Sequence, residues 1–123
     1  MTDVNILGGR RVLVVEDNYF LASDAARALK QAGAEILGPY PSEQAAYDEL
    51  ERERPEAAVL DINFGAGASF RLAGTLRERH IPFLFVTGYD RETIPPQFSD
   101  VERLTKPVLL TRVVEALSKL LPH

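Results

Sequence analysis

The sequence contains no cysteine and no tryptophan among its 123 residues. The absence of cysteine excludes disulfide scaffolds, thiolate zinc sites and cysteine nucleophiles. Apolar runs are also short, with at most 4 residues in a row, whereas a membrane-spanning helix needs roughly 20. The first residues have neither a basic start nor an apolar stretch, so they do not resemble a signal peptide. We therefore expect a soluble, reduced, cytoplasmic protein with no membrane attachment.

The sequence is also poor in basic charge. Lysine and arginine number 14 against 18 acidic residues, which gives a net charge of −4. A protein that binds nucleic acid through its phosphates needs a basic face, so we expect no direct binding of nucleic acid. The composition is otherwise that of a globular protein, and the length predicts one domain. We place this domain at residues 10–122, after a short N-terminal lead at residues 1–9.

Short apolar runs alternate with helical patterns along the chain. Four predicted strands cover residues 12–15, 34–37, 57–60 and 83–86, and a weaker fifth covers residues 101–104. Strands that are apolar throughout are buried on both faces, which favours a parallel sheet covered by helices. We predict an α/β fold of five strand and helix units.

Four of the predicted helices have clear boundaries. One is capped by Asn18 and ends at Gly33, and a second is capped by Ser42 and runs to about Arg54. Gly38-Pro39 closes the strand that precedes this second helix. A third carries Phe70 to Leu76, and the last carries Leu110 to Leu121. The segment 90–100 should hold another helix, yet it contains Pro95-Pro96, so we expect a short or irregular helix there.

Polar residues follow four of the predicted strands directly. Glu16 and Asp17 follow the first strand, Asp61 the third, Thr87 the fourth and Lys106 the fifth. Taken singly, each has an ordinary interpretation as a helix-cap, turn or surface residue. Open parallel sheets bind their ligands beyond the carboxyl ends of the strands, so the five residues together indicate a functional site.

The chemistry of this set favours phosphoryl transfer. Carboxylates gathered in one cleft repel each other, and a hard divalent cation such as Mg²⁺ relieves that repulsion. A carboxylate is able to accept a phosphoryl group as an acyl phosphate. A lysine, a metal ion and a threonine hydroxyl would neutralise or bind the oxygens of the transferred group.

At this point the sequence resembles the receiver domain of two-component response regulators, the CheY-like family. The resemblance covers residues 11–121 and is carried by VLVVED (residues 12–17), VLDIN (59–63), FVTG (85–88) and Lys106-Pro107. It implies a doubly wound, flavodoxin-like sheet with the strand order 2-1-3-4-5. No single piece of the motif is specific, but the combination is.

The resemblance also implies a role for each site residue. Asp61 would be the phosphorylated residue, and Glu16, Asp17 and Asp61 would hold Mg²⁺. Asn63 would offer its backbone carbonyl to the same ion. Thr87 would bind a phosphoryl oxygen and report phosphorylation, and Lys106 would contact the phosphoryl group.

The sequence departs from the usual receiver pattern at several positions. Arg103 stands three residues before the lysine, where the family usually has an aromatic switch residue, and a Gly65-Ala66-Gly67 loop replaces the proline that usually follows the phosphoacceptor. The run FVTGY at residues 85–89 is similar to a subfamily with a Phe-Ala-Thr-Gly-Tyr-like motif, with Val86 in place of alanine. Members of that subfamily often occur as single domains, lack the switch aromatic and have an irregular fourth helix.

Tyr89 carries a separate hypothesis. It lies two residues after Thr87, where a side chain is able to overhang the phosphorylation site. It would then act as the moving aromatic group or slow the attack of water. The alternative is a partly exposed loop tyrosine with no such role.

Three other functions compete with a phosphorylated receiver. A haloacid-dehalogenase-type phosphatase would need an aspartate at position 63, where this chain has asparagine. A dinucleotide-binding domain would need a glycine-rich turn after the first strand, where this chain has Glu16-Asp17-Asn18. A pseudo-receiver, which is a phosphate-independent protein-binding module of the same fold, stays open, because loss of the switch aromatic favours it.

The preferred function is therefore that of a signalling switch and not an enzyme in the usual sense. The domain would catalyse its own phosphorylation and its slow dephosphorylation. Its expected partners are a sensor histidine kinase and a phosphotransfer protein or downstream target. Dimerisation stays open, as does whether the chain is a shuttle, a phosphate sink or part of a larger protein.

Overall fold

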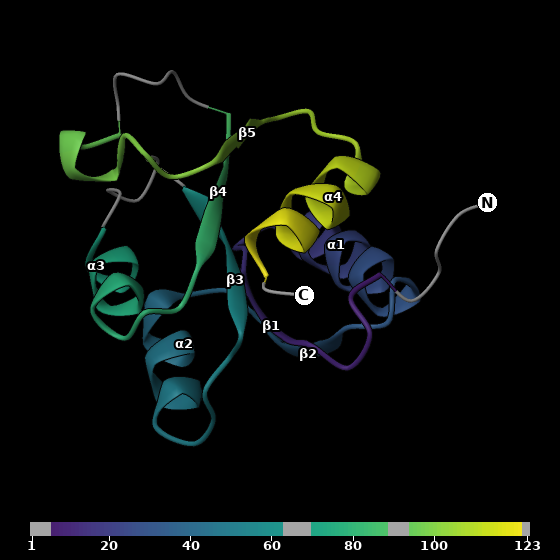
Figure 1. Ribbon diagram of the computed structural model, residues 1–123, viewed down its shortest axis with the longest axis horizontal. Coiled ribbons are helices and arrows are strands. Elements are labelled where there is room, and N and C mark those ends of the chain that lie inside the picture. Colours follow the sequence, from purple (N-terminus) through teal and green to yellow (C-terminus); the bar gives the residue numbers. More distant parts are fainter. Residues whose placement is uncertain (1–5, 63–69, 89–93, 122–123) are drawn as a thin grey trace.

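The computed structural model describes residues 6–62, 70–88 and 94–121 of the chain. Five parallel strands form one sheet in the order β2-β1-β3-β4-β5 (Figure 1). The strands are β1 (Arg11–Val15), β2 (Glu35–Tyr40), β3 (Ala57–Ile62), β4 (Phe83–Thr87) and β5 (Arg103–Thr105). The predicted fold class and strand order are confirmed.

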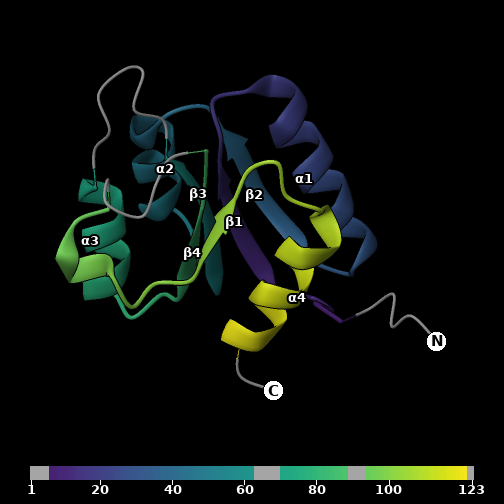
Figure 2. The same ribbon diagram turned by 90° about the horizontal axis from the view of Figure 1, so that it is seen from above.

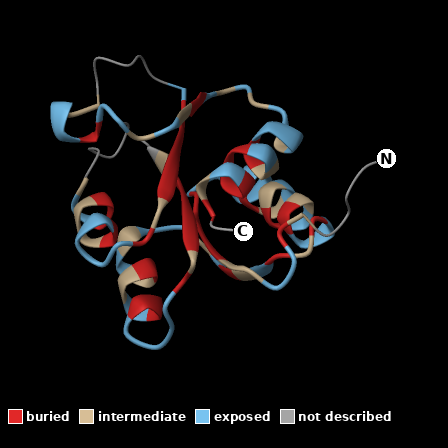
Figure 3. Cartoon of the chain, in the orientation of Figure 1, coloured by how far each residue is buried: buried red, intermediate tan, exposed pale blue. Residues whose placement is uncertain are grey.

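The sheet lies between two layers of helices. Figures 1 and 2 show α1 (Tyr19–Gln31) and α4 (Leu110–Leu120) on one face, with α2 (Glu43–Leu50) and α3 (Arg71–Glu78) on the other. Strands β1 and β4 are almost entirely buried, whereas the edge strands β2 and β5 are partly exposed (Figure 3). This is the arrangement that continuously apolar strands require, because both of their faces must be covered.

Alternate strand residues contribute to two separate cores. Val12, Val14 and Val59 point to the α1 and α4 face, whereas Leu13, Leu60 and Phe85 point to the α2 and α3 face. The second core contains a group of aromatic rings whose centroids lie 5.5–6.2 Å apart, made by Phe70, Phe83, Phe85 and Phe98. Such edge and stacked contacts add to the stabilisation that burial of the rings provides.

Two of the predicted helix caps are confirmed. The Asn18 side chain accepts a hydrogen bond from the Leu21 amide at 3.1 Å, and the Ser42 hydroxyl accepts one from the Ala45 amide at 3.2 Å. Each cap satisfies an amide that the first turn of a helix leaves without a partner. Asn18 thereby fixes the start of α1 directly after the acidic pair Glu16-Asp17.

Strand β2 is longer than predicted. We expected Gly38-Pro39 to close it, but it continues to Tyr40, which pairs with Val15 after a register shift. Gly38 makes the shift possible because it has φ = +106°, and a Cβ there would lie 2.8 Å from the Tyr40 nitrogen. The added pairing matters for the site, since the Glu16 amide donates a hydrogen bond to the Tyr40 carbonyl at 2.9 Å.

Helix α2 is shorter than predicted. It ends at Leu50 and not near Arg54, because the amides of Arg52 and Glu53 both bond to the Glu49 carbonyl and close a turn. Arg54 precedes Pro55, and a residue before proline disfavours the helical conformation. The same effect ends α4 at Leu120, since Leu121 is extended and precedes Pro122.

The connection between β4 and β5 is irregular, as predicted. Within its described part, residues 94–102, the only helix is the single 3-10 turn η2 (Pro96–Phe98). The Val101 amide bonds to the Phe98 carbonyl, which delays the start of β5 to Arg103 instead of Val101. The rest of the predicted helix, residues 90–93, lies outside the described residues.

The described end of the N-terminal lead packs on the domain. Leu7 is fully buried in the core under α1 and α4, and its amide donates to the Ala32 carbonyl at 2.8 Å. Gly9 bonds to the Gly33 carbonyl in the same way at 2.9 Å. Ile6 and Leu7 thus share the core of the domain that we placed at 10–122, and those bounds stay a prediction.

Candidate functional site

The carboxyl ends of the strands bring the predicted polar residues to one edge of the sheet. Glu16 and Asp17 follow β1, Asp61 lies in β3, and Lys106 follows β5. Oxygen atoms of Glu16, Asp17 and Asp61 lie within 4.8 Å of one another. The structure therefore brings the three carboxylates and the lysine together.

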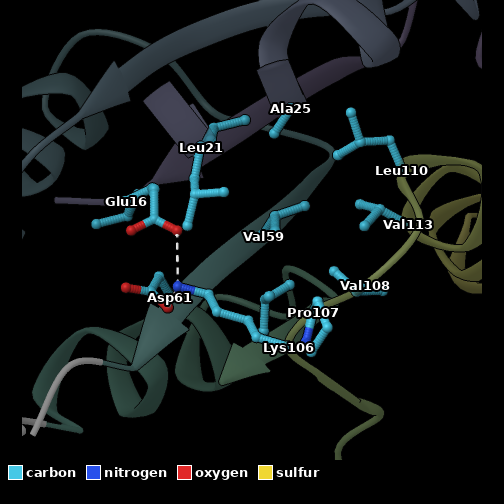
Figure 4. Close-up of a pocket in the computed structure, with 13 residues that line it drawn as sticks. Glu16, Leu21, Ala25, Val59, Asp61, Lys106, Pro107, Val108, Leu110 and Val113 are labelled. Carbon is cyan, nitrogen blue, oxygen red and sulfur yellow. Dashed lines mark hydrogen bonds and ion pairs between the residues drawn. The ribbon is translucent and has the colours of Figure 1, made fainter. Parts of the chain in front are cut away.

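Lys106 joins the cluster through two ion pairs. Its Nζ atom lies 2.7 Å from Asp61 Oδ1 and 3.1 Å from Glu16 Oε1 (Figure 4). The Asp61 and Glu16 side chains are only 6% and 9% exposed, so solvent screens these pairs little. One ammonium group here faces two buried carboxylates, and a third carboxylate lies beside them.

Glu16 is held from a second side by backbone. Its Oε2 atom accepts a hydrogen bond from the Asn18 amide at 3.1 Å. Asn18 was predicted only as a helix cap, and its amide contact with Glu16 had no signal in the sequence. The start of α1 thus positions both the cap and the buried carboxylate.

Burial and charge shift the pKa values of this cluster. Burial raises the pKa of Glu16 to about 7, and Asp61 adds to the rise, while the Asn18 amide and Lys106 act in the opposite direction. Burial by itself would lower the pKa of Lys106, but the bonds and charges of Asp61 and Glu16 outweigh it and raise that pKa. The cluster is therefore short of positive charge.

Thr87 lies on the strand between Asp61 and Lys106. It is fully buried at the end of β4, in register with Ile62 on one side and Thr105 on the other. Its carbonyl accepts a hydrogen bond from the Lys106 amide at 2.7 Å. In the register of the sheet, Thr87 therefore lies one position beyond Asp61 and one position before Lys106.

The structure also locates Arg103, the residue at the usual position of the switch aromatic. Arg103 begins β5 opposite Phe85 and is half-buried. Its Nη1 atom is buried and has no hydrogen-bond partner. Asn63, the 65–67 loop and Tyr89, which the sequence analysis also singled out, lie outside the described residues.

The donor set suits a hard divalent cation. Carboxylate oxygens are the protein ligands that Mg²⁺ prefers, and it commonly takes one or two of them and keeps waters for the remaining positions. Glu16, Asp17 and Asp61 offer such oxygens close together, with Lys106 as the only cation paired with them in the described part of the chain. The residues therefore fit a magnesium site.

Sequence relatives of the chain are regulatory proteins of bacteria. This chain is 24% identical over 120 residues to the transcriptional regulatory protein PdtaR of Mycobacterium tuberculosis. The aligned region covers 94% of this chain and 58% of PdtaR. The chain spans about half the length of the curated relatives it matches. No protein-family model matches it.

Solved structures give the fold and the kind of domain. SdrG from Pseudomonas melonis Fr1, in its BeF3-activated conformation, has a TM-score of 0.76 and 28% identity, over 98% of this chain and 100% of SdrG. A CheY-like response regulator receiver domain from Methylobacillus flagellatus has a TM-score of 0.73 and 20% identity, over 92% of this chain and 99% of that one. The chain is a response regulator receiver domain.

Receiver domains are signalling switches of two-component systems, and they generally bind Mg²⁺. The acidic cluster of this receiver domain lies where its strands end, as the resemblance implied. In the described part of the receiver domain, each helix is either too short or too polar to cross a membrane.

Proposed function

We propose that this receiver domain accepts a phosphoryl group on Asp61. The observation that carries the proposal is the gathering of Glu16, Asp17 and Asp61 within 4.8 Å, with Lys106 paired to Asp61. A carboxylate oxygen of Asp61 attacks phosphorus, the bond from phosphorus to the donor breaks, and a phosphohistidine donor leaves as imidazole. The product is an acyl phosphate on Asp61.

The other residues of the site stabilise the transferred group. Lys106 Nζ, which pairs with Asp61 before the transfer, donates to a phosphoryl oxygen afterwards. The Thr87 hydroxyl donates to a second oxygen. Glu16, Asp17 and Asp61, with the Asn63 carbonyl as a further ligand, would hold Mg²⁺, which would supply positive charge for the phosphoryl oxygens. Positioning and charge are most of what such a transfer requires.

Water later reverses the modification. It attacks phosphorus, the bond to the Asp61 oxygen breaks, and inorganic phosphate leaves while the carboxylate is regenerated. The domain is a switch that catalyses only these two steps on itself. We place the signal-dependent change in the 90–100 segment and in β5 and α4, which connect directly to Thr87 and Lys106.

We assign a sensor histidine kinase as the phosphodonor and a phosphotransfer protein or downstream target as the recipient of the signal. The likeness to response regulators supports this assignment. We also propose that the domain belongs with the Phe-Ala-Thr-Gly-Tyr-like receivers, which the FVTGY run and the irregular connection that contains η2 support. The role of Tyr89 over the site stays a prediction.

Beryllofluoride binding tests this function without a kinase. Adding BeF₃⁻ with Mg²⁺ should shift the amide NMR signals of Thr87 and Lys106, because the group mimics a phosphoryl on Asp61. Asp61→Asn should abolish the shifts, and Asp24→Asn, which removes the same charge from the exposed face of α1, should keep them. Signals that stay unchanged in the unsubstituted protein would favour the phosphate-independent pseudo-receiver.

A further inference from the structure

A cavity of about 370 Å³ lies between α1 and α4, beside the ionic cluster (Figure 4). Ten of the 13 residues that line it are apolar, and the other three are Glu16, Asp61 and Lys106. The apolar lining comes from the strands and both helices: Val14, Val15, Leu21, Ala25, Val59, Val86, Pro107, Val108, Leu110 and Val113. A concave apolar site with a few convergent polar groups is the usual form of a small-molecule pocket.

The charged end of the cavity has an excess of negative charge. Two carboxylates, Glu16 and Asp61, face the single ammonium of Lys106. Buried carboxylates are costly when their charge is not balanced. In the metal-free protein, a group that enters this end favourably must therefore be a cation.

The apolar lining of the cavity reaches the outside of the molecule at Leu21. Among the described residues, the large apolar side chains that are exposed are Tyr19, Phe20, Leu21 and Leu109, at 75%, 76%, 42% and 73%. Leu21 lines the cavity, and Phe20 and Leu109 directly precede lining residues. Contiguous exposed apolar surface marks a binding site more often than single apolar residues do.

We propose that this cavity binds a small organic cation with an apolar body. Its ammonium group pairs with Glu16 and Asp61, and its hydrocarbon part lies against Val59, Val113 and the facing side of α1. Charge complementarity selects this class of ligand, because an anion would face excess carboxylate. The apolar walls offer no ligand atoms to a hydrated metal ion. They therefore favour a cation with a hydrocarbon part over a metal ion.

Such a ligand would also oppose the switch, a consequence that rests on the proposed function. Glu16 and Asp61 serve both the proposed magnesium site and the head of the organic cation. Occupation of the cavity should therefore weaken Mg²⁺ binding and reduce phosphoryl transfer to Asp61. The cavity would then make the receiver sensitive to a second chemical signal.

Methyl NMR on the metal-free protein tests the site directly. Butyl-, hexyl- and octylammonium chloride are the probes, and they should shift the methyl signals of Val14, Val59 and Val113. Each added methylene should tighten binding about fourfold until the cavity is full, because roughly 0.8 kcal/mol is gained per buried methylene. Hexanoate, which has the same body and the opposite charge, should leave these signals unchanged.

Two matched variants locate the site. Ala25→Leu fills the cavity from α1 and should weaken hexylammonium binding at least tenfold, whereas Ala28→Leu, one turn further along the same helix, should leave it unchanged. Circular dichroism confirms that both variants fold. If Ala25→Leu does not fold, the dependence on chain length and on charge still decides the proposal.

The opposite results would overturn the proposal. Each of three results would do so: hexanoate binds as tightly as hexylammonium, the affinity does not rise with the length of the alkyl chain, or Ala25→Leu and Ala28→Leu lose the same amount of hexylammonium binding. If sedimentation shows instead that the protein dimerises and that Ala25→Leu breaks the dimer, the cavity belongs to an interface between copies. None of these readouts depends on phosphorylation, so a receiver that fails to accept phosphate is a separate outcome.

Discussion

Lys106 connects the carboxylates of the site in the absence of a metal ion. It pairs with Asp61 at 2.7 Å and with Glu16 at 3.1 Å, and both partners are buried. Buried charges remain ionised only when they are paired or hydrogen-bonded. The lysine therefore balances part of the negative charge that Mg²⁺ would otherwise have to balance.

Replacement of Lys106 separates metal binding from phosphoryl transfer. Lys106→Met should strengthen Mg²⁺ binding by about thirtyfold, because repulsion between a unit charge and a divalent ion about 4 Å apart is worth roughly 2 kcal/mol even in water. The same variant should accept a phosphoryl group more slowly, since it lacks a donor to the transferred oxygens. Calorimetric titration with MgCl₂ and a phosphorylation time course measure the two effects.

Lys119→Met serves as the matched control, because Lys119 lies in the exposed last turn of α4. It should change neither the Mg²⁺ affinity nor the phosphorylation rate. Weaker Mg²⁺ binding in Lys106→Met would show that the lysine supports the metal site and does not compete with it.

At the scale of elements, Arg77 ties α3 to the irregular connection before β5. Its Nη2 atom lies 3.0 Å and 3.1 Å from the two carboxylate oxygens of Asp100, and its guanidinium carbon lies 5.1 Å from the centre of the Phe98 ring. Arg77 also donates to the Gln97 carbonyl. One side chain thus contacts both η2 and the residues after it.

The pH dependence of this contact follows from the pKa of Asp100. The Arg77 guanidinium holds that pKa below its usual value, so the stabilisation exists above the unfolded-state pKa and is lost as the pH falls through the folded one. Arg77→Ala should raise the Asp100 midpoint toward its ordinary value. Carbon-detected NMR titration of the carboxyl group measures it, and Arg27→Ala on α1 is the charge-matched control.

An Asp100 midpoint that is the same in Arg77→Ala and in the unsubstituted protein would mean that the pair does not form in solution. The connection would then be held mainly by packing, above all by the contacts of Phe98 with Phe70, Phe83 and Phe85.

Most elements of the fold could be predicted from local patterns, and the errors have physical reasons. The strand cores and the caps Asn18 and Ser42 depend on residues close in sequence. The continuation of β2 to Tyr40 depends on a positive φ at Gly38 and on pairing with β1, which is a long-range effect. The short η2 and the late start of β5 depend likewise on how Phe98 packs.

The site was predictable to a similar extent. Parallel strands place their carboxyl ends at one edge, so the positions of Glu16, Asp17, Asp61 and Lys106 were sufficient to predict the cluster. The contacts of the Lys106 ammonium and of the Asn18 amide depend on side-chain and backbone geometry that spacing does not give. The cavity between α1 and α4 could not be predicted from the sequence either, because it depends on how two helices far apart in the chain pack together.

At the scale of the whole molecule, the folded unit includes residues before the first strand. Leu7 is fully buried and lies in the same core as residues of α1 and α4. Burial of the Leu7 side chain therefore adds to the free energy of unfolding, as burial of any other core leucine does. The N-terminal segment that the structure describes is therefore part of the domain in energetic terms.

Substitution of Leu7 measures that contribution. Leu7→Ala should lower the free energy of unfolding by about 2–5 kcal/mol, the usual cost of removing a buried leucine side chain. Leu109→Ala, at a leucine that is 73% exposed, should change it by no more than about 0.5 kcal/mol. Urea unfolding gives both values, and equal small effects would show that residues 6–9 are not anchored in solution.

The central claim is that Asp61 accepts a phosphoryl group in a magnesium-dependent step. Intact-mass measurement after incubation with acetyl phosphate and Mg²⁺ tests it most directly. We predict a gain of one phosphoryl group that disappears in Asp61→Asn and when the metal is chelated. An unchanged mass in the unsubstituted protein, or the same gain in Asp61→Asn, would contradict the account.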